Sequence, residues 1–158
     1  MERYPVTVAG NQSLKEELDR LKNIERPAVI KAIAVARDHG DLKENAEYHA
    51  ARDQQSFIEG RISEIDAKFA GIQVIDVTTL ARDGRVVFGT TVEVYDDDTE
   101  EEKVYQVVGE DEADFKQGKI SYNSPLARAM IGKKEGDDAV FQAPGGEKCL
   151  EIVSVKYI

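Results

Sequence analysis

Apolar residues recur at alternating spacings of three and four between residues 48 and 72. Charged side chains fill most of the positions between them, so one side of the segment is apolar and the other is solvated. This spacing is typical of a heptad seam, along which two helices pack as a coiled coil. The segment is therefore predicted to be a long helix. Its seam comprises Tyr48, Ala51, Gln55, Ile58, Ile62, Ile65, Phe69 and Ile72.

A second helical pattern precedes this one. Ser13 and Glu16 have the spacing of a capping box, in which each side chain bonds the other residue's free backbone N–H, so a helix is predicted to begin there. Because proline removes a helical hydrogen bond, Pro27 either kinks this helix or lies in the first turn of a new one. Helix is expected to about Asp38, and Gly40 suits a left-handed stop. The apolar face comprises Leu14, Leu18, Leu21, Ile30, Ile33 and Ala34.

Only a short acidic turn, with the sequence DHGDLKEN at residues 38–45, separates the two predicted helices. Helices joined by so short a connection pack antiparallel as a hairpin. About 30 residues in each arm, at 1.5 Å per residue, give a hairpin roughly 45 Å long. Such a hairpin would hold the turn far from the rest of the chain.

The pattern changes after residue 72 from helical spacing to short β-branched runs. A polar segment with a turn glycine follows at residues 81–85, and the boundary between two domains, residues 1–78 and 79–158, is predicted near residue 79. Ser124 and Pro125 have the cap and first-turn roles of a short helix. Strands are predicted at residues 86–88, 91–95, 103–108, 139–143 and 150–157. The second domain is thus expected to be an α+β domain, a mostly antiparallel sheet with one short helix.

Composition limits the classes of function. The 158-residue chain has a net charge of −10, and residues 79–158 carry most of the acidity. This charge argues against a free-standing binder of duplex DNA and favours a basic protein surface or a metal ion as partner. The lone Cys149 cannot form an internal disulfide, and no apolar run reaches the roughly 18 residues of a membrane span. The first residues do not resemble a signal peptide, so a cytoplasmic protein is expected.

Two carboxylates of the turn, Asp41 and Glu44, are the candidates for chemistry, and they admit two interpretations. In the structural one, Asp41 caps the second helix and Glu44, three residues on, completes an acidic form of the capping box. In the functional one, the carboxylates bind Mg²⁺, which takes one or two protein carboxylates and fills its other positions with waters or phosphate oxygens. Two carboxylates make a poor permanent metal site, so they would serve best by completing a site that begins in another protein.

Basic residues near the turn extend the functional interpretation. Arg37, Lys43 and Arg52 stand on the two arms, where they can contact nucleic-acid phosphates or form ordinary surface ion pairs. Other chemistry has little support. The acidic run at residues 96–102 lacks the spacing of a calcium loop, and the two histidines have no cysteine nearby to form a zinc site. The sequence offers no nucleophile triad or phosphate-cradling glycine loop.

The turn and its flanks resemble a known family. Residues 36–51, ARDHGDLKENAEYHAA, are similar to the tip of the bacterial transcript-cleavage factors of the GreA/GreB family. Residues 107–115, 118–121, 124–128 and 131–134 are similar to the C-terminal domain of that family. The resemblance spans essentially the full chain. It is nearer to the GreA branch than to the GreB branch, whose arms carry a larger basic patch.

The resemblance implies a fold and a mechanism. The fold would be a long N-terminal antiparallel coiled-coil hairpin followed by a C-terminal FKBP-like domain that docks on RNA polymerase near its secondary channel. The hairpin would enter that channel, where Asp41 and Glu44 would help to hold a second Mg²⁺, shared with the polymerase, and orient a water. The polymerase would then cut the 3′ end of backtracked nascent RNA. Arg37 and Arg52 match family positions near the tip that are placed to touch the RNA.

The same resemblance sets the expected partners. These are RNA polymerase, the nascent RNA and the DNA of the elongation complex. The chain would be a monomer without a tightly bound cofactor, and it would activate hydrolysis without being an enzyme itself. Its docking surface is expected around the short helix of the C-terminal domain, although core packing explains each apolar residue of that helix as well. The docking residues are predicted to be Ser124, Pro125, Leu126, Met130 and Ile131.

Two other classes of function stay open. One is a regulator or inhibitor that binds the same channel without supporting cleavage. The other is a peptidyl-prolyl isomerase, suggested only by the implied fold of the second domain. Isomerases of that fold use an aromatic-lined pocket, whereas this chain has no Trp and its aromatic residues are scattered along the second half of the sequence.

Overall fold

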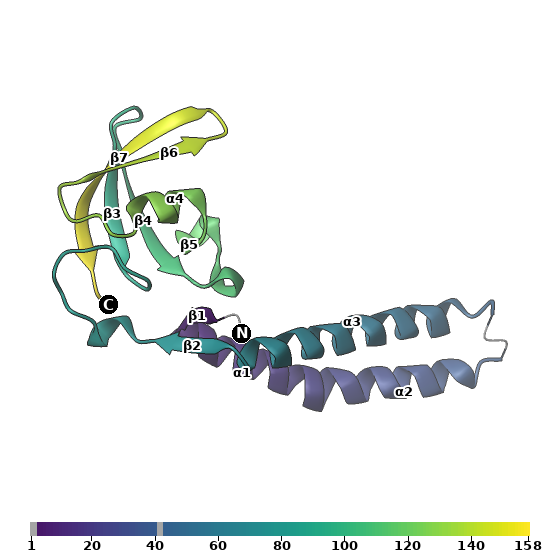
Figure 1. Cartoon of the computed structure of the whole chain (residues 1–158). Coiled ribbons are helices and arrows are strands. Elements are labelled where there is room, and N and C mark those ends of the chain that lie inside the picture. Colours follow the sequence, from purple (N-terminus) through teal and green to yellow (C-terminus); the bar gives the residue numbers. More distant parts are fainter. Residues whose placement is uncertain (1–2, 41–42) are drawn as a thin grey trace. The chain divides into compact units, whose positions relative to one another are not determined.

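The computed structural model describes residues 3–40 and 43–158 (Figure 1). These residues cluster into two compact units. Residues 12–72 form the first unit, and residues 3–11 together with 73–158 form the second. The first helix of the chain therefore begins in the second unit and continues into the first. No helix of the described residues is long and apolar enough to cross a membrane.

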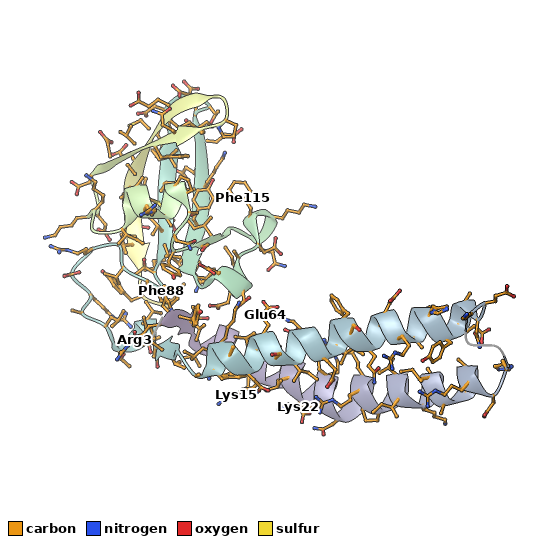
Figure 2. All side chains as sticks on the ribbon, turned by 45° about the vertical axis from the view of Figure 1, so that its right-hand side comes forward. Arg3, Lys15, Lys22, Glu64, Phe88 and Phe115 are labelled. Atoms are coloured by element: carbon orange, nitrogen blue, oxygen red, sulfur yellow. The ribbon has the colours of Figure 1, made fainter. Side chains whose placement is uncertain are left out.

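The first unit is a pair of helical arms (Figure 1). The first arm consists of α1 (Val8–Arg20), a π-helical turn η1 (Leu21–Glu25) and α2 (Arg26–Arg37), and the second arm is α3 (Ala46–Phe69). α2 packs against α3, and Leu14 and Leu21 of the first arm join the same buried cluster as Ile62 and Ile65 of α3. Charged side chains such as Lys15 and Glu64 project from the outer faces of the arms (Figure 2). The predicted helical hairpin is therefore confirmed.

The seam predicted for the second arm is confirmed over most of its length. Ala51, Ile58, Ile62 and Ile65 are buried, and Tyr48, Gln55 and Phe69 are partly buried. The last predicted position, Ile72, does not belong to the helix. α3 ends at Phe69, a turn follows in which the Gly71 N–H donates to the Lys68 carbonyl, and Ile72 begins strand β2 (Ile72–Ile75).

The predicted start of the first arm is wrong. The helix begins at Val8, well before the proposed capping pair Ser13 and Glu16, which both lie inside it. Thr7 caps the helix, because its hydroxyl accepts a hydrogen bond from the Gly10 N–H at 3.0 Å.

The apolar stripe predicted beyond Pro27 is confirmed at Ile33 and is wrong at Ile30, which is 53% exposed, and at Ala34, which faces solvent. Val29 and Ala36 are buried in their place. The π-helical turn η1 accounts for the change of register, because it inserts one extra residue into the helical repeat. Pro27 lies in the first turn of α2, which is the second of the two expected arrangements.

The second unit is built around a five-stranded sheet with the order β5-β4-β3-β7-β6. Neighbouring strands are antiparallel except β4 and β5, which are parallel. α4 (Pro125–Met130) packs against β5 and β6, and Ser124 caps it by accepting from the Ala127 N–H at 3.3 Å. The α+β architecture is confirmed. The strands are β3 (Thr91–Asp96), β4 (Glu101–Val108), β5 (Lys119–Ser121), β6 (Asp138–Ala143) and β7 (Gly146–Lys156).

Short elements complete the second unit. β1 (Tyr4–Thr7) pairs with β2, and 3-10 turns occur at η2 (Val77–Thr79), η3 (Glu110–Glu112) and η4 (Phe115–Gln117). The strand predicted at residues 86–88 is not formed. Val86 is fully buried there, and its N–H donates to the Lys133 carbonyl beyond α4 instead of to a strand of the sheet.

Candidate functional site

The acidic turn lies partly outside the described residues. Asp41 is not among them, whereas Glu44 is. The Glu44 side chain is exposed, and among the described residues it has no hydrogen-bond or ion-pair partner. An open hollow of about 490 Å³ adjoins it, lined by His39, Glu44, Asn45, Ala46 and Glu47. The charge of Glu44 is thus uncompensated within the described part of the chain.

Asn45 holds the base of the turn together. Its side-chain oxygen accepts from the Tyr48 N–H at 3.0 Å, and its side-chain amide donates to the Ala36 carbonyl at 2.6 Å. The first bond caps α3, and the second ties the start of α3 to the end of α2. The structural interpretation is therefore wrong for Glu44, because Asn45 is the cap of α3 and Glu44 precedes it, whereas Asp41 lies outside the described residues.

The predicted RNA-contacting residues lie at different points around the turn. The Arg37 guanidinium is 5.9 Å from the centre of the Tyr48 ring, a cation–π distance. Lys43 is exposed, and its carbonyl oxygen lies 3.0 Å from His49 Nε2. Arg52 is exposed further along α3. The structure therefore brings Arg37 and Lys43 close to the turn and leaves Arg52 on the arm.

The described part of the turn offers the Glu44 carboxylate as an oxygen donor for a metal ion. An exposed carboxylate without an internal partner is a suitable oxygen ligand for Mg²⁺. Among residues 3–40 and 43–158, no group of three or more His, Cys, Asp and Glu side chains is arranged to hold a metal ion. Glu44 therefore offers the chemistry of a single magnesium ligand, and the described residues provide no complete site around it.

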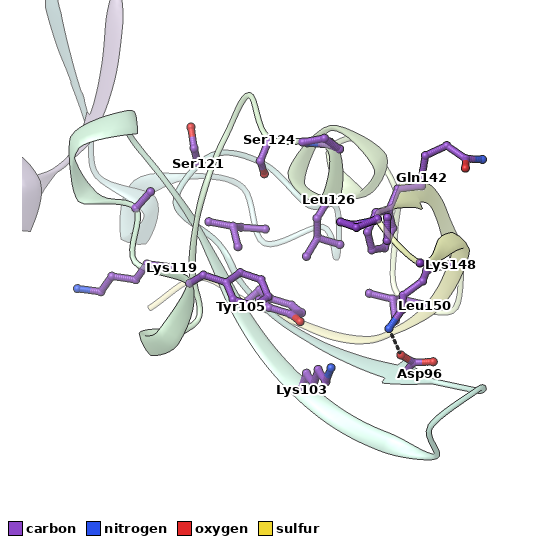
Figure 3. A pocket seen from close by; sticks show the side chains of 18 residues that line it. Asp96, Lys103, Tyr105, Lys119, Ser121, Ser124, Leu126, Gln142, Lys148 and Leu150 are labelled. Atoms are coloured by element: carbon purple, nitrogen blue, oxygen red, sulfur yellow. Dashed lines mark hydrogen bonds and ion pairs between the residues drawn. The ribbon is translucent and has the colours of Figure 1, made fainter.

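The second candidate surface is an apolar pocket of about 620 Å³ in the second unit, which is called the sheet domain below (Figure 3). Tyr105 of β4, Phe115 of η4 and Phe141 of β6 all line it. Aromatic residues that are scattered in the sequence thus converge in space, contrary to the expectation from the sequence. The Tyr105 and Phe115 rings lie 6.0 Å apart, and Phe115 is 69% exposed, so the pocket offers an accessible apolar face.

The predicted docking residues have different relations to this pocket. Ser124, Pro125 and Leu126 line it. Ile131 is 39% exposed and is not among the lining residues. Met130 is fully buried in the core beneath α4, where it supports the helix and is not accessible to a partner.

An ion pair with one buried partner, Asp96, lies in the wall of the pocket. Asp96 is 1% exposed, accepts from the Asp98 N–H at 3.0 Å, and lies 3.4 Å from the Lys148 ammonium (Figure 3). Burial by itself would raise the pKa of the Asp96 carboxyl, but these hydrogen bonds together hold it below its usual value. The pKa of Tyr105 is raised by burial and by the Asp96 charge. The sequence shows only a run of acids at residues 96–102, which does not predict this pair.

Comparisons with known proteins agree over both units. A family model described as transcription elongation factor, N-terminal, matches residues 4–74, and the model for the C-terminal part of GreA/GreB transcription elongation factors matches residues 81–157. The chain belongs to the GreA/GreB family of transcription elongation factors, which confirms the resemblance seen at the turn.

Individual relatives are similar over their whole length. Transcription elongation factor GreA of Thioalkalivibrio sulfidiphilus is 64% identical over 158 residues, covering 100% of both chains. The factors of the same name from Alkalilimnicola ehrlichii and Halorhodospira halophila are 60% and 62% identical over 157 residues, covering 99% of each chain.

Proposed function

We propose that this chain binds RNA polymerase, inserts its hairpin turn through the secondary channel and stimulates the polymerase's own Mg²⁺-dependent cleavage of backtracked RNA. It acts as an accessory factor, and the bond is broken in the active site of the polymerase. The observation that carries this proposal is the acidic turn at the end of the helical hairpin, where the exposed Glu44 has no partner among the described residues.

The acidic residues have the central role in this proposal. Asp41 and Glu44 would hold a Mg²⁺ shared with the polymerase, an ion that would supply charge stabilisation at the scissile phosphate. Their carboxylates also accept hydrogen bonds from the attacking water and thereby orient it. Arg37, Lys43 and Arg52 contact RNA phosphates, which fixes the position of the 3′ end without reading its sequence.

Docking on the polymerase is assigned to the apolar pocket of the sheet domain. Its lining combines exposed aromatic surface at Phe115 with Pro125 and Leu126, and it is rimmed by polar groups such as Ser124. An apolar side chain presented by a polymerase segment would fill such a pocket. The buried Met130 contributes by holding α4 in place.

The proposal is tested with stalled, backtracked elongation complexes incubated with and without the protein. We expect shortened RNA 3′ ends only in its presence, and no shortening would overturn the proposal. The double variant Asp41→Asn/Glu44→Gln should bind polymerase as well as the wild type and fail to stimulate cleavage. If the wild type binds but supports no cleavage, the chain is a channel-binding regulator instead.

One observation favours the isomerase as a second candidate function. Tyr105, Phe115 and Phe141 converge on one pocket, which the sequence did not suggest. A proline-peptide isomerisation assay separates the two functions. If the pocket serves docking only, the protein leaves the isomerisation rate unchanged, whereas acceleration that Phe141→Ala abolishes would establish an isomerase.

A further inference from the structure

Thr7, which caps the start of α1, is held by the carboxylate of Glu112, and both residues lie in the second unit. Glu112, in η3, accepts hydrogen bonds from the Thr7 N–H at 3.1 Å, from the Gly109 N–H at 3.0 Å and from the Thr7 hydroxyl. The Thr7 hydroxyl in turn accepts from the Gly10 N–H at 3.0 Å. One carboxylate thus joins residues that are 105 positions apart in the sequence.

The position of this carboxylate is favourable for the helix. The first N–H groups of a helix have no partner within it, and the positive end of its dipole attracts negative charge. Thr7 is only 8% exposed, so water competes poorly for these bonds, and bonds to an ionised acceptor are the strong ones. Glu112 therefore supports the start of α1 indirectly, by holding the N–H and the hydroxyl of Thr7, the residue that caps the helix.

Two glycines make room for the carboxylate. A Cβ atom added to Gly10 would lie 2.1 Å from Glu112 Cδ, and one added to Gly109 would lie 2.7 Å from the Pro5 carbonyl oxygen. Any side chain at Gly10 would push the carboxylate away from the helix start. The carboxylate is therefore closely surrounded, and this arrangement needs glycine at both positions.

We propose that Glu112 is a positioning residue for the cleavage that the chain stimulates. It holds Thr7 at the start of α1, the helix that begins in the second unit and continues into the first arm of the hairpin. The inference rests on the proposed function. Glu112 does not touch RNA or the reacting atoms in this scheme, and it acts through α1.

Two variants displace the carboxylate in different ways. Glu112→Gln keeps the shape but replaces an acceptor with an amide that cannot accept from all three donors. Gly10→Ala keeps the charge and pushes the carboxylate out of its seat. Glu102→Gln, at an exposed position on β4, removes a charge from the same domain and serves as the matched control.

The experiment titrates each protein against backtracked complexes and measures amide hydrogen exchange. For Glu112→Gln and Gly10→Ala, we expect the maximal cleavage rate at saturation to fall roughly tenfold, because small misplacements of catalytic groups are costly. The concentration for half-maximal cleavage should stay unchanged, exchange should quicken in residues 8–12, and β3 and β7 should stay protected. Glu102→Gln should match the wild type.

The outcomes separate the inference from the proposed function. A merely structural role would lower the melting temperature and leave the maximal rate of the folded protein intact, and this result would overturn the inference. So would a loss that appears only in the half-maximal concentration, since that would make Glu112 a docking residue. A wild type that stimulates no cleavage would overturn the proposed function itself. If Glu112→Gln fails to fold, Gly10→Ala decides by the same criteria.

Discussion

Two carboxylates of this chain are held in opposite ways. Asp96 is buried in the wall of the apolar pocket, where a backbone N–H and the Lys148 ammonium compensate its charge. Glu44 is exposed at the end of the helical hairpin and has no partner among the described residues. In the sheet domain, the charge of Asp96 is therefore compensated inside the domain, and the accessible surface of the pocket is apolar. At the hairpin turn, the carboxylate of Glu44 is accessible to another molecule.

The largest effect on stability is expected at Asp96. Asp96→Ala leaves Lys148 and the Asp98 N–H without their acceptor and should lower the melting temperature of the protein strongly. Because the pKa of Asp96 in the folded protein lies below its usual value, its contribution is present at neutral pH and is lost as the pH falls through the folded-state pKa. Thermal unfolding against pH checks this, with the exposed Glu102→Ala as control. Equal melting temperatures for both variants would contradict the compensated-charge interpretation.

Phe115 tests whether the apolar surface of the pocket binds polymerase. Phe115→Ala removes an exposed ring from the pocket and should weaken polymerase binding by about 30-fold, as for a hot-spot residue. Cleavage at saturating protein should be unchanged. The matched control is Phe57→Ala, which removes a phenylalanine of α3 that is 74% exposed. This variant should bind polymerase as well as the wild type does. Equal losses for the two variants would remove the pocket from the docking surface.

Asn45 tests how the turn is held. Asn45→Ala removes the cap of α3 and the bond to the Ala36 carbonyl, which should cost about 1–2 kcal/mol of local stability. Hydrogen exchange of residues 46–49 measures the loss. Asn45→Asp keeps the acceptor but loses the donor, so its effect should be intermediate. If Asn45→Ala exchanges like the wild type, Asn45 does not hold the turn.

The smallest effect is expected at the ion pair between the arms. Arg61 donates to Glu17 at 2.7 and 2.8 Å, and this hydrogen-bonded guanidinium lowers the pKa of the Glu17 carboxyl. Glu17→Gln should lower the free energy of unfolding by about 0.5 kcal/mol at neutral pH, since both groups are partly exposed. The difference should vanish as the pH falls through the folded-state pKa of Glu17. Glu16→Gln is the control, and denaturant unfolding at two pH values is the measurement.

The sequence pattern predicted the elements whose determinants are local. The seam of α3 and the cap of α4 follow from residues close together in the chain, and both were found as expected. The start of α1 was missed because its decisive partner, Glu112, is far away in sequence. In α2, Ile30 and Ala34 were wrongly assigned to the buried face because a single π turn changes the register, and no residue marks such a turn as plainly as proline marks a kink.

In the candidate site, too, features set by neighbouring residues could be predicted, whereas those formed by residues far apart in the sequence could not. The acidic residues at the turn could be singled out from their spacing, and the family resemblance supplied the role that is proposed for them. Asn45 was overlooked because Asp41 offered a competing cap in the same turn. The apolar pocket could not be predicted, because Tyr105, Phe115 and Phe141 meet only through the folding of three separate elements.

The Mg²⁺ dependence of stimulated RNA cleavage tests the central claim most directly. The claim is that the turn supplies ligands for an ion in the active site of the polymerase. Loss of one ligand in Glu44→Gln should raise the Mg²⁺ concentration for half-maximal cleavage roughly tenfold, with polymerase affinity unchanged. Glu47→Gln, at an exposed acid in the first turn of α3, should follow the wild type. Superimposable Mg²⁺ curves for Glu44→Gln and the wild type would contradict the claim.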